Sequence, residues 1–168
     1  MKQYRESADA YRQAIKLDPY NAADAYYALG LTYRDWARPD DEIQAYKQAI
    51  RLKPDYTVAY ERLGARYLQS KKFAESIEIF KQLAILKPGD AFAPNNLGEA
   101  YLGLGKLNDA LEAFKQAIRM KPDFGRAYFN LGKCHLALGN RDAALDQYNI
   151  LQNIDQDWAE KLNNLINP

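Results

Sequence analysis

The sequence has little of what most catalytic, metal and redox sites are made of. Its 168 residues include one histidine and one cysteine, His135 and Cys134. A lone cysteine cannot close an internal disulfide, and one histidine with one cysteine cannot complete the ligand set of a typical zinc site. Neighbouring residues of a helix point about 100° apart, so the two make a poor nucleophile–base pair. We expect no catalytic residue, metal or cofactor, hence no enzyme, and a packing role for His135.

An excess of charge is also missing. Lys and Arg total 23 and Asp and Glu total 22, which leaves a formal net charge of +1. Nucleic-acid binders need a basic surface that neutralises phosphates, so we expect no nucleic acid among the partners. No apolar run is long enough to span a bilayer, and the first residues, MKQYRE, lack the apolar stretch of a secretory signal. We expect a cytoplasmic protein without membrane insertion; if the chain belongs to a longer protein, that protein sets the compartment.

What the sequence does contain is a repeat. Pairs of leucine and glycine recur every 34 residues, at Leu29-Gly30, Leu63-Gly64, Leu97-Gly98 and Leu131-Gly132. The same spacing separates Pro54, Pro88 and Pro122. Between these marks, each period holds two stretches of about 14 residues whose apolar residues recur at helical spacing. Every period is therefore predicted to be a pair of amphipathic helices that ends before a proline.

The repeated residues also resemble a known family. The pattern Tyr26-x2-Leu29-Gly30-x2-Tyr33, followed by Tyr46, Ala49 and Pro54, is similar to the tetratricopeptide repeat (TPR), a helix–turn–helix unit with the same period. Later periods match the pattern again. The resemblance implies an all-α fold, a right-handed α-solenoid of stacked helix–turn–helix repeats, and a role in binding other proteins.

Counting periods along the chain predicts a single TPR domain over residues 1–168. It comprises a half repeat (1–19), four repeats (23–56, 57–90, 91–124 and 125–158) and a C-terminal capping helix (159–168). Because the half repeat has the pattern of a second helix without a first, we expect the chain to be the C-terminal part of a longer repeat protein. The alternative is a natural start on a half repeat. Its apolar side chains Tyr4, Ala8, Tyr11 and Ile15 would lack a covering helix, so the segment should fray or pair with another molecule.

The recurring glycine predicts close packing within each helix pair. A glycine has no Cβ atom, so the second helix can approach closely, and a small residue is expected opposite it. The residues at that opposite position are Glu42, Ser76, Ala110 and Ala144. Three of them are small, but the carboxylate of Glu42 predicts either a looser helix pair or a partner such as Tyr33 or Arg38.

A partner is expected on the concave face, which the first helix of each pair lines. On one side these helices carry Tyr27, Leu31, Arg62, Phe92, Asn95, Asn96, Glu99, Arg126, Phe129, Asn130 and Lys133. Such a mixture of aromatic, amide and cationic groups suits an extended peptide or a partner's helix. The alternative interpretation is a solvated polar face without a ligand.

Comparison with individual TPR proteins refines this expectation. Co-chaperones of the family hold acidic C-terminal peptides with a clamp of lysine, asparagine and arginine, and only Asn96 and Arg126 match its positions. Asn96 and Asn130 resemble instead the asparagine ladder with which the O-linked N-acetylglucosamine transferases hold a peptide backbone. This resemblance implies that both amides lie outside the core and are free to bond a ligand.

The sequence therefore predicts a non-catalytic scaffold for protein–protein interaction that binds a peptide or a partner helix through its concave face. Two alternatives stay open. The chain could be the substrate-docking or regulatory arm of a larger enzyme, or it could assemble with copies of itself through the N-terminal half repeat. The identity of the protein partner does not follow from the sequence.

Overall fold

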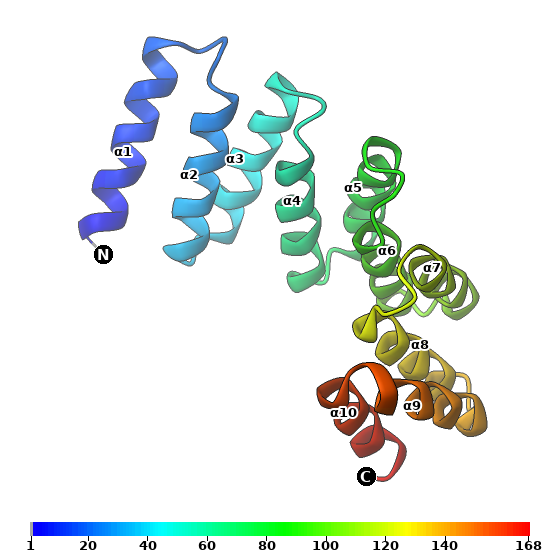
Figure 1. Cartoon of the computed structure of the whole chain (residues 1–168). Helices are drawn as coiled ribbons and strands as arrows, with labels where there is room; N and C mark the ends of the chain where they lie inside the picture. Colours follow the sequence, from blue (N-terminus) through cyan, green and yellow to red (C-terminus); the bar gives the residue numbers. More distant parts are fainter. Residues whose placement is uncertain (1) are drawn as a thin grey trace. The chain divides into compact units, whose positions relative to one another are not determined.

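The computed structural model describes residues 2–168, which form ten α-helices and no strand (Figure 1). The helices are α1 (Lys2–Leu17), α2 (Ala23–Asp35), α3 (Pro39–Leu52), α4 (Thr57–Gln69), α5 (Phe73–Leu86), α6 (Phe92–Gly103), α7 (Leu107–Met120), α8 (Gly125–Ala137), α9 (Arg141–Ile154) and α10 (Gln156–Ile166). The all-α fold predicted from the sequence is confirmed. None of the described helices is long and apolar enough to cross a bilayer.

The chain divides into two compact units, one ending at Ser70 and one running from Lys71 to Pro168. In the first unit, α2 packs against α1 and α3, and α3 packs against α4. In the second, each helix from α5 to α9 packs against the next, and α10 contacts both α8 and α9. Helices thus pack chiefly against their neighbours along the chain, as in a stack of helix–turn–helix repeats. The boundary between the units falls between α4 and α5, inside the predicted second repeat.

The prolines end the second helices as predicted. Lys53, which precedes Pro54, has φ −132° and ψ 88°, and Lys121, which precedes Pro122, has φ −138° and ψ 91°. Both have left the helical region because the ring of the following proline would clash with a helical residue before it. The α10 helix begins at Gln156 instead of the predicted residue 159. Its preceding residue, Asp155, caps it by accepting a hydrogen bond from the backbone N–H of Trp158 (3.2 Å).

The turn inside each helix pair uses a left-handed residue at one recurring place. These residues are Ala37 (φ 56°), Lys71 (φ 55°), Gly105 (φ 71°) and Gly139 (φ 77°). Positions of this kind favour glycine, since a Cβ atom crowds the backbone there. The first two repeats keep the same turn without glycine, at a cost in conformational energy.

Aromatic rings lie against two of the recurring glycines, Gly30 and Gly98. A Cβ atom built on Gly30 would be 2.4 Å from the ring of Tyr46, and one built on Gly98 would be 2.5 Å from the ring of Phe114. The prediction of close packing holds for these two pairs, and the small residue expected opposite each glycine stays a prediction. A ring of the second helix rests on the exposed Cα atom, where any side chain would displace it.

Glu42 is buried and ion-paired. Its side chain is 3% exposed, and Oε2 lies 2.7 Å from Nε of Arg66 on α4. The predicted partners are therefore wrong: Arg38 pairs with Asp41 (2.7 Å) instead. Burial raises the pKa of Glu42, and Arg66 opposes that rise. The carboxylate thus links α3 to the following helix without loosening its own helix pair.

Helix α1 is covered on one side by α2. Ala8 is fully buried, and Tyr11 and Ile15 pack partly buried against the cluster around it. The expectation that these side chains lack a covering helix is wrong for these three residues, because α2 supplies one. Tyr4 is 38% exposed. Fraying or pairing of the half repeat stays a prediction, and Met1 lies outside the described residues.

Candidate functional site

In the second unit, α6 and α8 lie side by side and bring most of the predicted site residues together. We call this region the α6–α8 face; it comprises Phe92, Asn96, Glu99, Arg126, Phe129 and Lys133, together with the buried Asn95 and Asn130. Its polar half centres on Glu99. Oε1 of Glu99 accepts hydrogen bonds from the amides of Asn95 (3.1 Å) and Asn130 (2.8 Å). The guanidinium of Arg126 lies 2.8 Å from the same oxygen.

Two of the asparagines in this network are core residues. Asn95 is fully buried and Asn130 is 3% exposed. The Nδ2 group of Asn130 also donates to Oδ1 of Asn95 over 3.0 Å, which joins the two helices. The expectation that Asn95 and Asn130 are exposed on the concave face is therefore wrong, because a hydrogen bond between their buried amides joins the two helices. Asn96, 34 residues before Asn130, is only half-buried, and its Oδ1 accepts a hydrogen bond from the amide of Asn95 (3.3 Å).

The apolar half of the α6–α8 face consists of exposed or half-buried aromatic rings. Phe92 is 49% exposed and meets the ring of Phe124 edge-on, with centroids 4.9 Å apart. Phe129 packs against Trp158 of α10, with centroids 4.7 Å apart. The ammonium of Lys133 lies 5.5 Å from the centroid of Phe129. Aromatic side chains with this exposure are enriched at protein interfaces.

Two residues of this surface were missed by the sequence reasoning. Trp158 precedes the predicted start of the capping helix at residue 159, so it was not placed on any face. Lys161, whose ammonium lies 4.2 Å from the centroid of Trp158, belongs to the predicted capping helix but was not assigned to a binding surface. The cap of Asp155, which starts α10 earlier, was the signal that could have found them.

In the first unit, the predicted site residues are more dispersed. Tyr27 lies in an aromatic cluster, with ring centroids 5.8 Å from Tyr46 and 5.4 Å from Tyr56. Leu31 lines a cavity of about 380 Å³ between α1 and α2, with Tyr4 on its opposite wall. Arg62 is exposed on α4. As ligand contacts, these three residues stay predictions.

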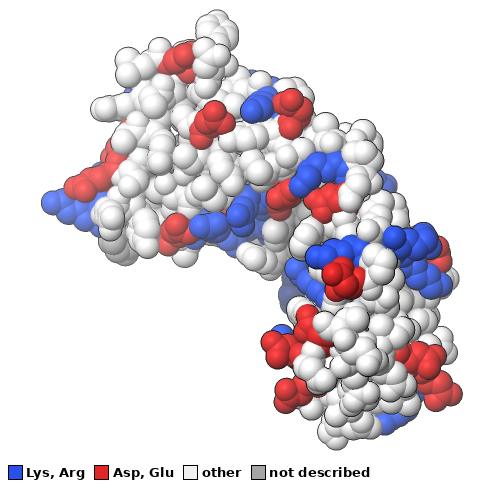
Figure 2. Space-filling model, in the orientation of Figure 1, with Lys and Arg blue, Asp and Glu red and all other residues white. Residues whose placement is uncertain are grey.

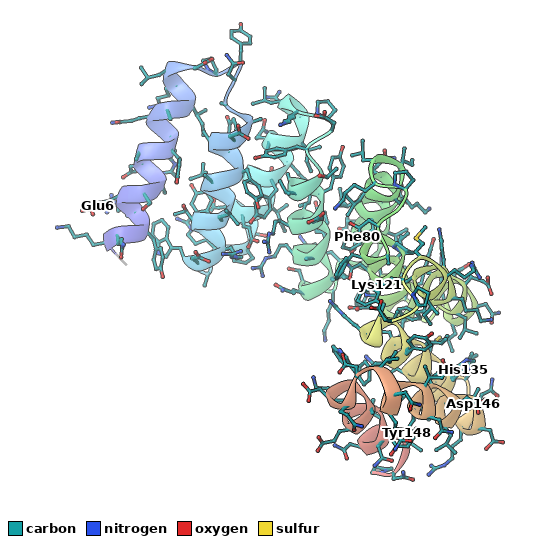
Figure 3. All side chains as sticks on the ribbon, viewed as in Figure 1. Glu6, Phe80, Lys121, His135, Asp146 and Tyr148 are labelled. Atoms are coloured by element: carbon teal, nitrogen blue, oxygen red, sulfur yellow. The ribbon has the colours of Figure 1, made fainter. Side chains whose placement is uncertain are left out.

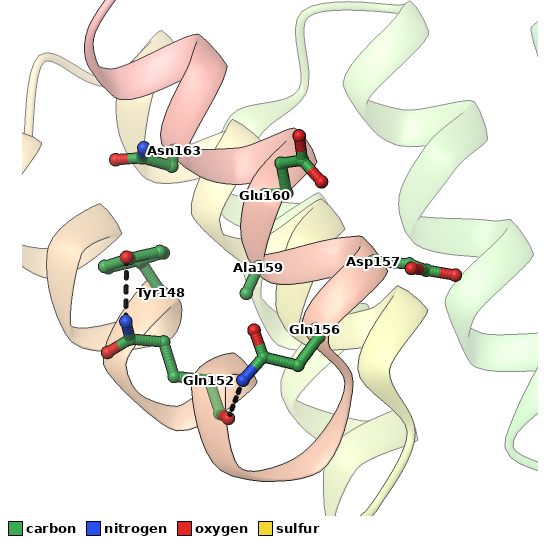
Figure 4. A pocket seen from close by; sticks show the side chains of 7 residues that line it. All are labelled: Tyr148, Gln152, Gln156, Asp157, Ala159, Glu160 and Asn163. Atoms are coloured by element: carbon green, nitrogen blue, oxygen red, sulfur yellow. Dashed lines mark hydrogen bonds between the residues drawn. The ribbon is translucent and has the colours of Figure 1, made fainter.

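A second cavity, of about 300 Å³, lies between α9 and α10 (Figure 4). Its lining is mostly polar: Tyr148, Gln152, Gln156, Asp157, Ala159, Glu160 and Asn163. Two of its amides are already paired, because Gln152 donates to the Tyr148 hydroxyl (2.8 Å) and Gln156 donates to the backbone carbonyl of Gln152 (3.0 Å). The sequence analysis did not predict this cavity.

The lone cysteine and histidine do not form a reactive pair. The thiol of Cys134 is buried, donates to the carbonyl of Leu107 (3.3 Å), and has its pKa raised by burial. His135 lies on α8, near Asp146 of α9 (Figure 3). Burial and the ammonium of Lys115 lower the pKa of His135, and Asp146 opposes them. Within residues 2–168, no group of three or more histidine, cysteine or carboxylate side chains could hold a metal ion.

Charges of both signs are interspersed on the face shown in Figure 2. Elsewhere along the chain, recorded ion pairs join residues of one helix, such as Lys115 with Glu112 (3.5 Å) and Arg34 with Asp35 (2.8 Å). This distribution accords with the net charge of +1. Pairs of this exposure contribute little to stability.

Family models place the repeats along the chain. A TPR repeat model matches residues 1–34, and two tetratricopeptide repeat models match residues 23–56 and 95–159. The chain belongs to the tetratricopeptide repeat family. A sequence search of curated proteins finds no significant match.

Solved TPR structures have the same fold. A crystal structure of MamA has a TM-score of 0.83 and 28% identity, over 94% of this chain and 91% of MamA. YrrB, described as a TPR protein with an unusual peptide-binding site, has a TM-score of 0.82 and 21% identity, over 97% of this chain and 84% of YrrB. TTC0263, a thermophilic TPR protein of Thermus thermophilus, has a TM-score of 0.72 and 20% identity, over 97% of this chain and 90% of TTC0263. The TPR fold of this chain is that of protein-interaction scaffolds.

Proposed function

We propose that this TPR protein is a non-catalytic scaffold that holds an extended peptide or a partner's helix on its predicted concave face. In the second unit this surface is the α6–α8 face, and in the first it includes Tyr27, Leu31 and Arg62. The observation that carries the proposal is Phe92, whose side chain is 49% exposed at the start of α6. An exposed aromatic side chain beside polar side chains is typical of the hot spots of protein interfaces.

Peptide display followed by two matched variants tests this proposal. Random peptides are selected on the immobilised chain, and the affinities of the selected peptides are then measured for Phe92→Ser and Ile85→Ser. Ile85 is the matched control, because it is 72% exposed on α5, a second helix of the same unit. Loss of an aromatic anchor should weaken binding about tenfold or more, while the control should bind like the parent chain.

Selected peptides that bind Phe92→Ser as tightly as the parent chain would contradict binding on the α6–α8 face. A thermal melt of both variants serves as the folding control. Neither side chain is buried, so both melting temperatures should stay close to that of the parent.

A second candidate function, homotypic assembly, is favoured by the surface at α1. The half-exposed ring of Tyr4 and the side chain of Leu31 lie on the walls of one open cavity of about 380 Å³, which could receive a second copy. Tyr4→Glu would place a charge in that contact and should return any dimer to the monomer mass. Sedimentation velocity over a range of concentrations measures this. A parent chain whose mass does not change with concentration would rule the candidate out.

A further inference from the structure

Two ammonium groups in the second unit lack a carboxylate partner. Among residues 2–168, neither Lys133 nor Lys161 has a carboxylate within ion-pair distance; their recorded contacts are with aromatic rings. Arg126, by contrast, is held by Glu99 over 2.8 Å. The α8 and α10 helices of this unit therefore present two positive charges without an ion-pair partner among the described residues.

The rings beneath these ammonium groups are fixed in position. Phe129 and Trp158 contact one another, with centroids 4.7 Å apart and planes inclined by 39°. Both pack partly buried against the core cluster that contains Leu162. Each ring thus has one side in the core and one side outside, so ordering it costs a ligand little. We call Phe129, Lys133, Trp158 and Lys161 the aromatic–lysine cluster.

Among the described residues, no carboxylate of α6 or α10 forms an ion pair with Lys133 or Lys161. Glu99 accepts from two buried amides and from Arg126. On α10, Asp157 and Glu160 line the cavity that this helix forms with α9 (Figure 4). An acidic ligand would therefore find two ammonium groups at the cluster that have no carboxylate partner.

We infer that the aromatic–lysine cluster binds an acidic peptide segment that carries an apolar or aromatic side chain. The carboxylates of the peptide pair with Lys133 and Lys161, and its apolar side chain packs on the outer sides of Phe129 and Trp158. This inference rests on the proposed function, since it names the class of peptide that the second unit holds. Aromatic rings supply contact area, and the two charges supply selectivity for acidic sequences.

The fluorescence of Trp158 can report binding at the aromatic–lysine cluster. The chain has two tryptophans, and Trp36, which follows α2 in the first unit, is replaced in a Trp36→Phe background. The fluorescence of Trp158 is then titrated with three synthetic peptide pools of equal length: glutamate with phenylalanine, lysine with phenylalanine, and glutamate with serine. The glutamate–phenylalanine pool should shift the emission at the lowest concentration, and added sodium chloride should weaken this response.

Two double variants that lose the same charge distinguish binding at the aromatic–lysine cluster from a general effect of net charge. Lys133→Ala with Lys161→Ala should weaken binding of the glutamate–phenylalanine pool about tenfold. Lys72→Ala with Lys106→Ala removes the same charge from exposed positions before α5 and α7 of the same unit, and should change binding less than about twofold. Circular dichroism melts verify that all variants are folded.

The outcomes distinguish this inference from the proposed function. The inference is overturned if the lysine pool binds as well as the glutamate pool, if both double variants behave alike, or if no pool shifts Trp158. In each of these cases, display-selected peptides that still require Phe92 would leave the proposed function standing. If those peptides also ignore Phe92, both proposals fail.

Discussion

Asn96 and Asn130 hold equivalent places in consecutive repeats, yet the structure separates their roles. Asn130 is 3% exposed and bonds both Asn95 and Glu99 between α6 and α8. Asn96 is half-buried and does not share in the bonds between α6 and α8. One amide thus belongs to the core and the other is partly exposed, although nothing in their sequence positions distinguishes them.

Alanine at these two positions should affect stability very differently. Asn130→Ala leaves the buried Oδ1 of Asn95 without its donor, which should lower the unfolding free energy by about 1–3 kcal/mol. Asn96→Ala should stay within about 0.5 kcal/mol of the parent. Urea unfolding followed by circular dichroism measures both, and equal stabilities would contradict the core assignment of Asn130.

The buried carboxylate of Glu42 makes stability depend on pH. Burial raises its pKa in the folded chain above the usual 4.5, so the folded state holds this proton more tightly than the unfolded state. Stability from this group is then greatest below pH 4.5 and falls as the pH rises through the raised value. Glu42→Gln cannot ionise. Its unfolding free energy, measured from about pH 4 to pH 7 as a difference from the parent, should rise with pH; a flat or falling difference would show that Arg66 outweighs burial.

At the scale of elements, Gly30 and Gly98 each allow the first helix of a pair to approach the second helix closely. Gly98→Leu has to displace the ring of Phe114, which lies 2.5 Å from the position of a Cβ atom, and should destabilise the chain by about 1–3 kcal/mol or more. Gly89→Leu is the matched control, since nothing lies within 4 Å of a Cβ atom there. Thermal melts compare the two variants. If both melt like the parent, the close contact of α6 with α7 is not needed for stability.

In the turns within the helix pairs, introducing a glycine should stabilise the chain. Ala37 keeps a left-handed φ of 56°, a conformation that costs an L-residue about 1–2 kcal/mol. Ala37→Gly should therefore raise stability by about 1 kcal/mol, after allowance for the extra freedom of glycine in the unfolded chain. Gly105→Ala, at the equivalent turn, should lower stability by a similar amount. A lower melting temperature for Ala37→Gly would contradict this account of the turn.

Most of the helices can be predicted from the sequence, because the 34-residue repeat sets their spacing. The spacing of Leu97-Gly98 and of the prolines predicts helix pairs, their order and their approximate ends. Contacts between neighbouring repeats are harder to predict, because they depend on how far each helix is rotated about its own axis. The pairing of Glu42 with Arg66 joins two repeats, and the burial of Asn130 depends on the rotation of α8 against α6. No spacing within one period contains that information.

At the scale of the whole molecule, contacts are concentrated within two units, and the boundary between them in the sequence lies between Ser70 and Lys71. Repeat proteins unfold in steps when such units differ in stability. Trp36 reports the first unit in a Trp158→Phe chain, and Trp158 reports the second in a Trp36→Phe chain. We expect a lower urea midpoint for the smaller first unit. Coincident fluorescence midpoints would show that the chain unfolds as one cooperative body.

The carboxylate of Glu99 competes with the anions of a ligand for binding to Arg126. Its carboxylate is already bound by Arg126 and by two buried amides, and it is tethered to the site that it occupies. A tethered group competes at an effective concentration of about the millimolar range or above. A free carboxylate, such as an acidic metabolite, is outcompeted at this arginine by the chain itself. Arg126 therefore becomes available only to a ligand that is anchored elsewhere on the same surface and delivers its anion at comparable local concentration.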